Sequence, residues 1–160
     1  MTGRVLLPAV LLTAVLSLRA DPVDTAYDLM EAIEYRDGYA LEDLLSQDLY
    51  AAIDGFLEQV RGMIETDPVL AGNLLEGRYS GSITIDDFRN MTNQEILGRV
   101  MGEVRLLPLE QVESETARLE GRNAVVVISY FGGASVSFDM TWEDGGWRVT
   151  DSSLLGEVFR

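Results

Sequence analysis

The sequence predicts an α+β fold in which N-terminal helices pack on a curved C-terminal antiparallel four-strand meander. Apolar residues recur at helical spacing from Val23 to Val104, and they alternate with polar residues from Gln111 onward. Helices that all precede the strands, rather than alternating with them, indicate segregated layers. We therefore expect one α+β domain over residues 21–160, helical over 21–105 and with its sheet over 109–153.

Residues 1–20 have the pattern of a secretory signal peptide. Arg4 precedes an apolar run from Val5 to Leu18, and the small residue Ala20 ends the segment. As a helix this run would span about 21 Å, which is short of the ~30 Å hydrocarbon core that a membrane anchor must cross. Cleavage after Ala20 or after Ser17 fits the pattern. We expect an exported protein, periplasmic or secreted, with no membrane association after cleavage.

Capping residues mark where the helices begin. The apolar stripe of one amphipathic helix, from Leu49 to Ile64, needs an apolar partner, and we expect it to cover the sheet face that carries Phe138, Met140 and Trp142. The helix that starts at Asp67-Pro68 should be short, running through Leu75 and closing at Gly77. The expected starts are Asp21, Leu41, Ser46, Asp67, Thr84 and Thr92, the last two as capping boxes.

The C-terminal third contains the four expected strands. The segment from Ala124 to Tyr130 is apolar at nearly every position, so it should be central and covered on both faces. Asp144-Gly145-Gly146 is a strong hairpin signal, because both turn positions need positive φ. The strands are expected at Gln111–Leu119, Ala124–Tyr130, Ser135–Glu143 and Trp147–Asp151.

The composition excludes several kinds of chemistry. The chain has no His, no Cys and no Lys, which rules out Ser-His-Asp and Cys-His catalysis, Cys-based zinc sites, Schiff bases and the P-loop. The net charge is −15, and removing Arg4 and Arg19 with the leader takes it to −17. This field repels phosphate backbones, so we expect no nucleic-acid partner. We also expect no cofactor, and the simplest role of the charge is to keep the protein soluble.

Two stretches carry a resemblance to a known superfamily. The opening helix with Asp37-Gly38 and Leu41-x-x-Leu44-Leu45-Ser46, and the closing segment Trp142–Asp151, resemble the first helical hairpin and the last β-hairpin of the nuclear transport factor 2-like (cystatin-like cone) superfamily. The resemblance implies helices laid across a strongly curved sheet that enclose a pocket. Members include isomerases, dehydratases and binding proteins, and many dimerise through the outer sheet face, so fold alone does not select a function. The middle of this chain, from Leu49 to Val104, has more helix than the simplest members.

The aromatic sheet face and the long helix supply the candidates for a ligand pocket. Trp142 and Trp147 flank the last hairpin, where they could line a pocket or form a stabilising cross-strand pair. The candidates are Phe56, Val60, Tyr130, Phe138, Met140, Trp142 and Trp147.

Other polar residues have ordinary structural explanations. The oxygen-rich stretch 86–95 does not have the spacing of a calcium loop and is better explained by helix capping, so we expect no metal site. Asp139 is expected to face solvent, and Arg118 and Arg148 could anchor an anion but more often pair across strands. The tyrosines that could support histidine-free catalysis are Tyr27, Tyr35, Tyr39, Tyr50 and Tyr130, and we assign no catalytic residue among them.

Three functions therefore stay open. The first is an exported, non-catalytic domain that binds a small apolar ligand in a cavity between sheet and helices. The second is a histidine-free isomerase or dehydratase with a Tyr/Asp pocket. The third is an interaction module that recognises a protein partner or forms a homodimer through the outer face of the sheet.

Overall fold

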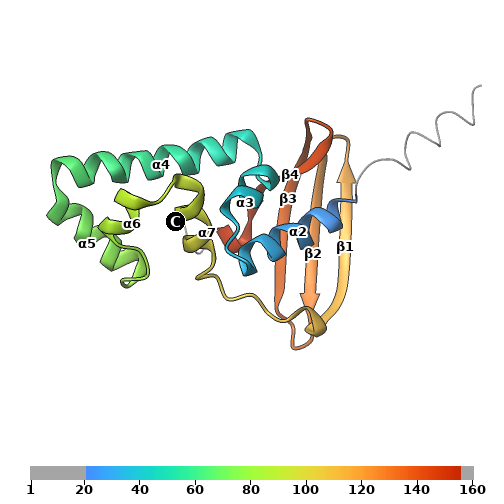
Figure 1. Ribbon diagram of the computed structural model, residues 1–160. Helices are drawn as coiled ribbons and strands as arrows, with labels where there is room; N and C mark the ends of the chain where they lie inside the picture. Colours follow the sequence, from blue (N-terminus) through green and yellow to red (C-terminus); the bar gives the residue numbers. More distant parts are fainter. Residues whose placement is uncertain (1–20, 156–160) are drawn as a thin grey trace, which may run out of the picture.

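A computed structural model describes residues 21–155 and shows the predicted α+β fold, with helices first and a four-strand antiparallel meander after them (Figure 1). The strand order is β1-β2-β3-β4. The helices are α2 (Pro22–Glu34), α3 (Gly38–Leu44), α4 (Gln47–Thr66), α5 (Pro68–Tyr79), α6 (Ile85–Asn90) and α7 (Asn93–Met101), followed by the 3₁₀ turn η1 (Leu109–Gln111). The strands are β1 (Val112–Glu120), β2 (Asn123–Tyr130), β3 (Ser135–Glu143) and β4 (Gly146–Ser152).

Five of the six helices begin at the predicted residues. The exception is α3, which was expected to begin at Leu41 but begins at Gly38, because Asp37 caps it by accepting from the Ala40 amide. Both capping boxes are reciprocal, with the side chains of Thr84 and Thr92 accepting from the third helical amide while the acid at that position accepts from the threonine amide. The predicted end of α5 at Gly77 is wrong, because the helix continues to Tyr79 and stops only where Ser80 turns left-handed at φ 50°. A glycine inside a helix weakens it without ending it.

The sheet presents one buried and one open face. The β3–β4 turn has the predicted positive φ at Asp144 (48°) and Gly145 (84°). Irregularities in register, near Val112 in β1 and next to Asp139 in β3, interrupt the ladders. The buried inner face carries Ala124, Val126, Ile128, Tyr130, Phe138, Met140, Trp147 and Val149.

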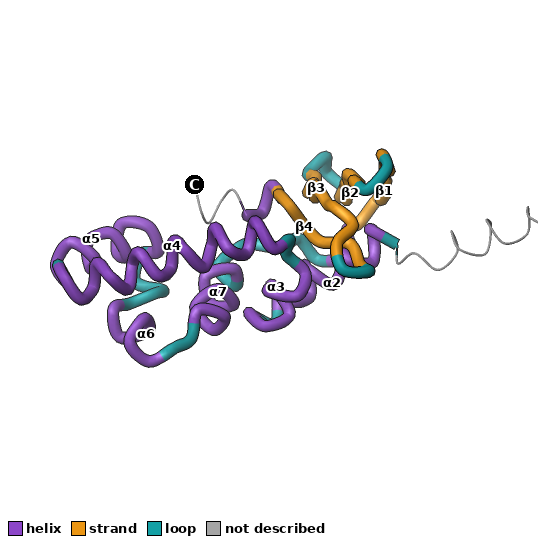
Figure 2. Tube along the Cα trace, turned by 90° about the horizontal axis from the view of Figure 1, so that it is seen from above, coloured by secondary structure: helices purple, strands orange, loops and turns teal. Residues whose placement is uncertain are grey.

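The prediction that the central strand is covered on both faces is wrong. Figure 2 shows helices on one side of the sheet only, and the side chain of Val125 in β2 is 41% exposed. Its cross-strand partners on this outer face are Arg118 in β1 and Asp139 in β3. Valine suits a pleated surface whether or not the surface is covered, so its presence could not distinguish the two cases.

The sheet is covered mainly by α2, whereas α3 and α4 reach it only at β4, which corrects the predicted packing of residues 49–64. Helix α2 contacts β1, β2 and β4, and the Tyr130 hydroxyl lies 4.0 Å from the Met30 sulfur. The apolar stripe of α4 is buried as predicted, but α4 packs against α5 and α6 and contacts the sheet at β4. Together α4, α5 and α6 form a helical arm, residues 47–90, that extends away from the sheet (Figure 1).

Two close approaches join the helices to one another and to the sheet. At the crossing of α3 and α7, a Cβ on Gly38 would overlap the Gln94 carbonyl oxygen, and a Cβ on Gly98 would overlap that of Arg36. Only glycine permits backbones this close. At the edge of the sheet, the Ser46 amide donates to the Val149 carbonyl (2.9 Å) beside a parallel bridge between Leu45 and Val149.

Candidate binding groove

The structure divides the seven predicted pocket residues between two regions. Phe56 and Val60 lie in the helical arm, where Val60 is buried and the Arg78 guanidinium stands 5.4 Å from the Phe56 ring centroid. The other five lie on the inner face of the sheet. Trp142 is half-buried and meets Trp147 edge-to-face, with ring centroids 5.4 Å apart.

These seven residues therefore do not converge on one cavity. Tyr130, Phe138, Met140 and Trp147 are each at most 2% exposed and belong to the hydrophobic core. None of the seven lines any of the three pockets described below. The interface that we expected to hold a ligand is occupied by the protein's own side chains.

The remaining polar candidates make local contacts. Arg118 pairs with Glu120 two residues along the same strand, at 2.5 Å, and both side chains are largely exposed. The stretch 86–95 serves in capping and in ion pairs, such as Arg99 to Asp87 at 2.6 Å. Burial is the largest influence on the Asp87 carboxyl and opposes its charge, but hydrogen bonds from Thr84 and the charge of Arg99 together hold its pKa below the usual range.

The largest of the three pockets is a groove of about 790 Å³ between α2 and the segment that leads from α7 to β1. We call this segment, residues 102–110, the strap. Buried Met30 and Ile33 of α2 line the bottom of the groove. The strap contributes Val104, Leu106, Leu107, Pro108 and Leu109. The groove is thus apolar at its base and along one wall.

The α2 wall owes its character to helical spacing. Glu31 and Glu34 of α2 and Tyr35 at its C-cap are exposed, Tyr27 is half-buried at the edge of the core, and Met30 and Ile33 are buried. Two phenol rings and two carboxylates therefore stand along one side of the groove. The spacing of this stripe, three, four and eight residues, is visible in the sequence, but its tyrosines were considered there only as catalytic candidates.

The middle of the strap, residues 105–108, lies between a turn and η1 and is extended for a local reason. Leu107 precedes Pro108, and the residue before proline is restricted to extended backbone. Exposure alternates along Val104, Arg105, Leu106 and Leu107, as expected of an extended segment. Val104 and Leu106 therefore pack against the core, while Leu107, Pro108 and Leu109 stay at the surface.

Two interactions tie α2 and its C-terminal turn to the strap and its continuation in β1. The Tyr27 hydroxyl donates to a carboxylate oxygen of Glu115 at 2.5 Å. This hydrogen bond, together with burial and the charge of Glu115, raises the pKa of Tyr27 to about 12. Arg36 and Glu103 form a looser, exposed ion pair at 3.7 Å. The groove lies between these two attachments.

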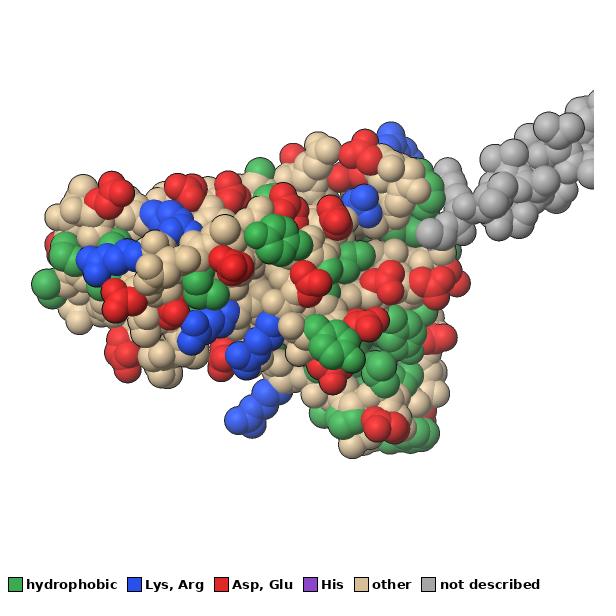
Figure 3. All heavy atoms as spheres, in the orientation of Figure 1, with side chains coloured by type: hydrophobic (Ala, Val, Ile, Leu, Met, Phe, Trp, Pro, Cys, Tyr) green, Lys and Arg blue, Asp and Glu red, His purple; other side chains and the backbone are tan. Residues whose placement is uncertain are grey.

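The groove is acidic as well as apolar. Its lining includes the carboxylates of Glu31, Glu34 and Glu110 and no basic side chain. Figure 3 shows hydrophobic and acidic side chains interspersed on this face of the molecule, below α2 and in front of the sheet. A ligand that complements it needs apolar surface and positive charge.

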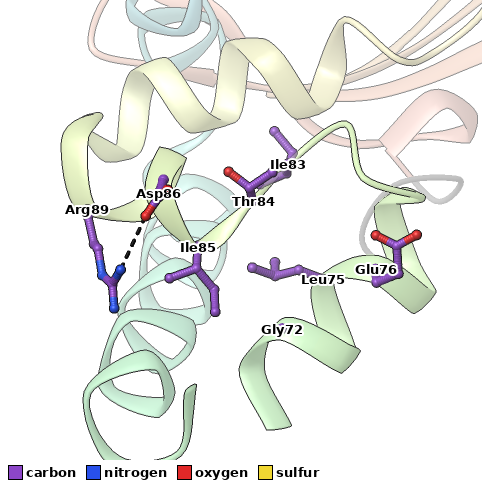
Figure 4. A pocket seen from close by; sticks show the side chains of 8 residues that line it. All are labelled: Gly72, Leu75, Glu76, Ile83, Thr84, Ile85, Asp86 and Arg89. Carbon is purple, nitrogen blue, oxygen red and sulfur yellow. Dashed lines mark hydrogen bonds and ion pairs between the residues drawn. The ribbon is translucent and has the colours of Figure 1, made fainter. Parts of the chain in front are cut away.

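Two smaller pockets lie in the helical arm. One, of about 420 Å³, lies between α5 and α6, and Figure 4 shows Leu75 and Ile85 pointing toward one another within it. Its Arg89 is paired with Asp86 at 3.2 Å. The other, of about 560 Å³, is lined by residues that include Arg61 and Phe88. The first pocket is lined by α5, α6 and the loop between them, and the second by residues of α4, α5 and α6. Both pockets are therefore gaps between packed helices.

Residues 21–155 contain neither a candidate metal site nor a candidate membrane span. No group of three or more acidic side chains in this range is arranged to hold a metal ion. No helix in this range is long and apolar enough to cross a membrane. The predicted signal peptide, residues 1–20, lies outside the described residues.

In comparisons with known proteins, no family model, no curated protein and no solved structure matches this chain.

Proposed function

We propose that this chain is a non-catalytic binding domain whose ligand is an amphipathic cation held in the groove between α2 and the strap. The observation that carries the proposal is the lining of the groove: an apolar base and wall beside three carboxylates, with no basic side chain. An apolar ligand body would displace water from Met30 and Ile33, and its positive charge would lie near Glu31 and Glu34.

The two tyrosines of the groove add to this preference for cations. Tyr27 and Tyr35 both line the groove, and an aromatic face attracts a cation within about 6 Å of its centroid. Tyr35 is 72% exposed, which leaves its ring accessible to a ligand. The proposal moves the ligand from the sheet–helix interface that we expected to a groove on the open side of α2.

The enzyme alternative draws no support from the groove. A tyrosine that stabilises a developing oxyanion must donate its single hydroxyl proton to the substrate. The proton of Tyr27 is committed to Glu115, and a pKa of about 12 makes the phenol a weaker acid than usual. The assembly alternative has only a narrow apolar strip, Val125 and Val127, on the outer face of the sheet. Export and membership of the nuclear transport factor 2-like superfamily stay predictions from the sequence.

Calorimetric titration of the full chain tests the proposal. The probe is decyltrimethylammonium, kept below its micelle-forming concentration, and decyl sulfate is the anionic counterpart. We expect the cation to bind with one-to-one stoichiometry and the anion to bind at least about tenfold more weakly, because the carboxylates repel it. Equal affinity for both amphiphiles would refute the charge argument.

A matched pair of variants locates the site. Leu109 in the strap and Leu70 in the helical arm are both 53% exposed, so their replacement by serine removes similar apolar surface. Leu109→Ser should weaken binding of the cation by about threefold to tenfold, while Leu70→Ser leaves it unchanged. Equal effects of the two substitutions would show that the amphiphile binds exposed leucines without regard to the groove.

A further inference from the structure

The strap carries peptide groups that the fold leaves unpaired. Its flanks are anchored, since the Val104 amide donates to Met101 (3.0 Å) and the Gln111 amide donates to Pro108 (2.9 Å). Between them, within the described part of the chain, the amides of residues 105–107 donate to no protein acceptor. On extended backbone alternate amides share a side, so the free amides of Arg105 and Leu107 can pair with another extended chain.

The side chains around these amides suit a peptide that carries both apolar and basic residues. The strap and the base of the groove offer apolar surface, and Glu31 and Glu34 stand on the opposite wall. In an extended chain, successive side chains point to opposite sides. A segment that alternates apolar and basic residues could therefore turn its apolar side chains toward the strap and the base of the groove, and its basic side chains toward the carboxylates of α2.

The groove is also open to solvent. Leu107, Leu109 and Tyr35 all line it and are all exposed. Sites for small molecules usually enclose most of the ligand surface. An open trough instead suits a chain that enters at one end and leaves at the other.

We propose that the groove takes an extended, basic and apolar segment of a partner protein, which pairs its backbone with Arg105–Leu107. Apolar side chains of the segment lie against Leu106 and Ile33, and arginine or lysine side chains lie against Glu31 and Glu34. This inference rests on the proposed function and names the class of its ligand.

Fluorescence anisotropy with labelled octapeptides tests the inference on the full chain. The first probe alternates leucine and arginine, the second replaces each arginine with glutamate, and the third carries N-methyl groups on alternate amides of the first. We expect the basic peptide to bind and the acidic peptide to show no binding. N-methylation should weaken binding by about tenfold or more, because each lost backbone hydrogen bond contributes about 0.5–1.5 kcal/mol.

A charge-matched pair of variants separates local from overall electrostatics. Glu31→Gln/Glu34→Gln should weaken binding of the basic peptide by about fivefold. Asp43→Asn/Glu65→Gln changes the net charge equally, at exposed positions outside the groove, and should have little effect. Equal effects of both pairs would attribute binding to the net charge of the protein and overturn the inference.

The remaining outcomes distinguish this inference from the proposed function. If decyltrimethylammonium binds in the groove and the basic peptide does not, the proposed function stands and the peptide inference fails. If neither binds, both fail. If the basic peptide binds and N-methylation has no effect, pairing with the strap is refuted.

Discussion

The crossing of α3 and α7 and the groove between α2 and the strap are formed by neighbouring stretches of the same chain, yet one is closed and the other open. At the crossing, Gly38 and Gly98 let two backbones meet with no side chain between them. A few residues later the strap leaves α7 and runs apart from α2, with a groove of about 790 Å³ between them. The chain closes a junction tightly where glycines face one another, whereas the residues that line the open groove, such as Leu106 and Pro108, are bulky.

The largest expected effect on stability comes from adding a methyl group at the crossing of α3 and α7. Gly98→Ala would push a methyl group into the Arg36 carbonyl and to 2.8 Å from the Gly38 nitrogen, and backbone atoms cannot rotate away. We expect a loss of about 3 kcal/mol or more in the free energy of unfolding, measured by urea denaturation.

The control for this substitution is Gly55→Ala on α4. Nothing lies within 4 Å of a Cβ at Gly55, so alanine should stabilise the helix by about 0.5–1 kcal/mol. A Gly98→Ala variant as stable as the original chain would show that the crossing can relax, and the contrast with the groove would lose its basis.

The next effect concerns how the helical arm is attached. The Arg61 guanidinium on α4 donates to the carbonyls of Phe88 and of Met91 (2.8 Å) and to the Asn93 side chain (2.9 Å). Arg61→Met keeps the aliphatic stem but leaves these acceptors without their donor, so we expect a loss of about 2–3 kcal/mol in urea denaturation. Arg89→Met removes an exposed ion pair and should change stability by less than about 0.5 kcal/mol. Similar losses from the two substitutions would contradict this role of Arg61.

The smallest effect concerns an attachment of the groove itself. Tyr27→Phe removes the hydrogen bond to Glu115, and we expect a loss of up to about 1 kcal/mol at neutral pH. Because the pKa of Tyr27 is raised from 10.0 to about 12 on folding, its contribution is complete below pH 10 and is lost as the pH rises from 10 to 12.

Alkaline urea denaturation measures this dependence. The phenylalanine variant should lose less stability between pH 10 and pH 12 than the original chain does. Some dependence should persist, because burial and nearby Glu42 and Asp54 raise the pKa of Tyr50 to about 12 as well. Tyr35→Phe should leave stability unchanged, and an unaltered pH profile for Tyr27→Phe would argue against the hydrogen bond.

Local features of this fold could be predicted from the sequence because neighbouring residues determine them. The threonine capping boxes and the Asp144-Gly145 turn each depend on a few consecutive residues, and the structure confirms them. The antiparallel meander follows from short turns between alternating segments. The partner of the α4 stripe could not be predicted this way, since amphipathicity shows that a face is buried without showing what covers it.

The groove escaped prediction for a related reason. Its two walls, around Tyr27 and Leu106, are far apart in the sequence and become neighbours only in the folded chain. The apolar strap looks like a loop before a strand, and its leucines could equally have entered the core. The aromatic residues that did attract attention, Phe138 and Trp147 among them, fill the core, which is the commoner place for large apolar side chains.

The bridge between Leu45 and Val149 limits how the sheet can be extended. With the α3–α4 junction bonded to the middle of β4, a foreign strand approaching from that side would collide with Leu45 and Ser46. Among residues 21–155, the β1 edge alone is then left to accept a neighbour. A sheet with a single receptive edge can form a pair but cannot polymerise into a continuous ribbon, so the junction that attaches the helices also protects the protein from fibrous self-association.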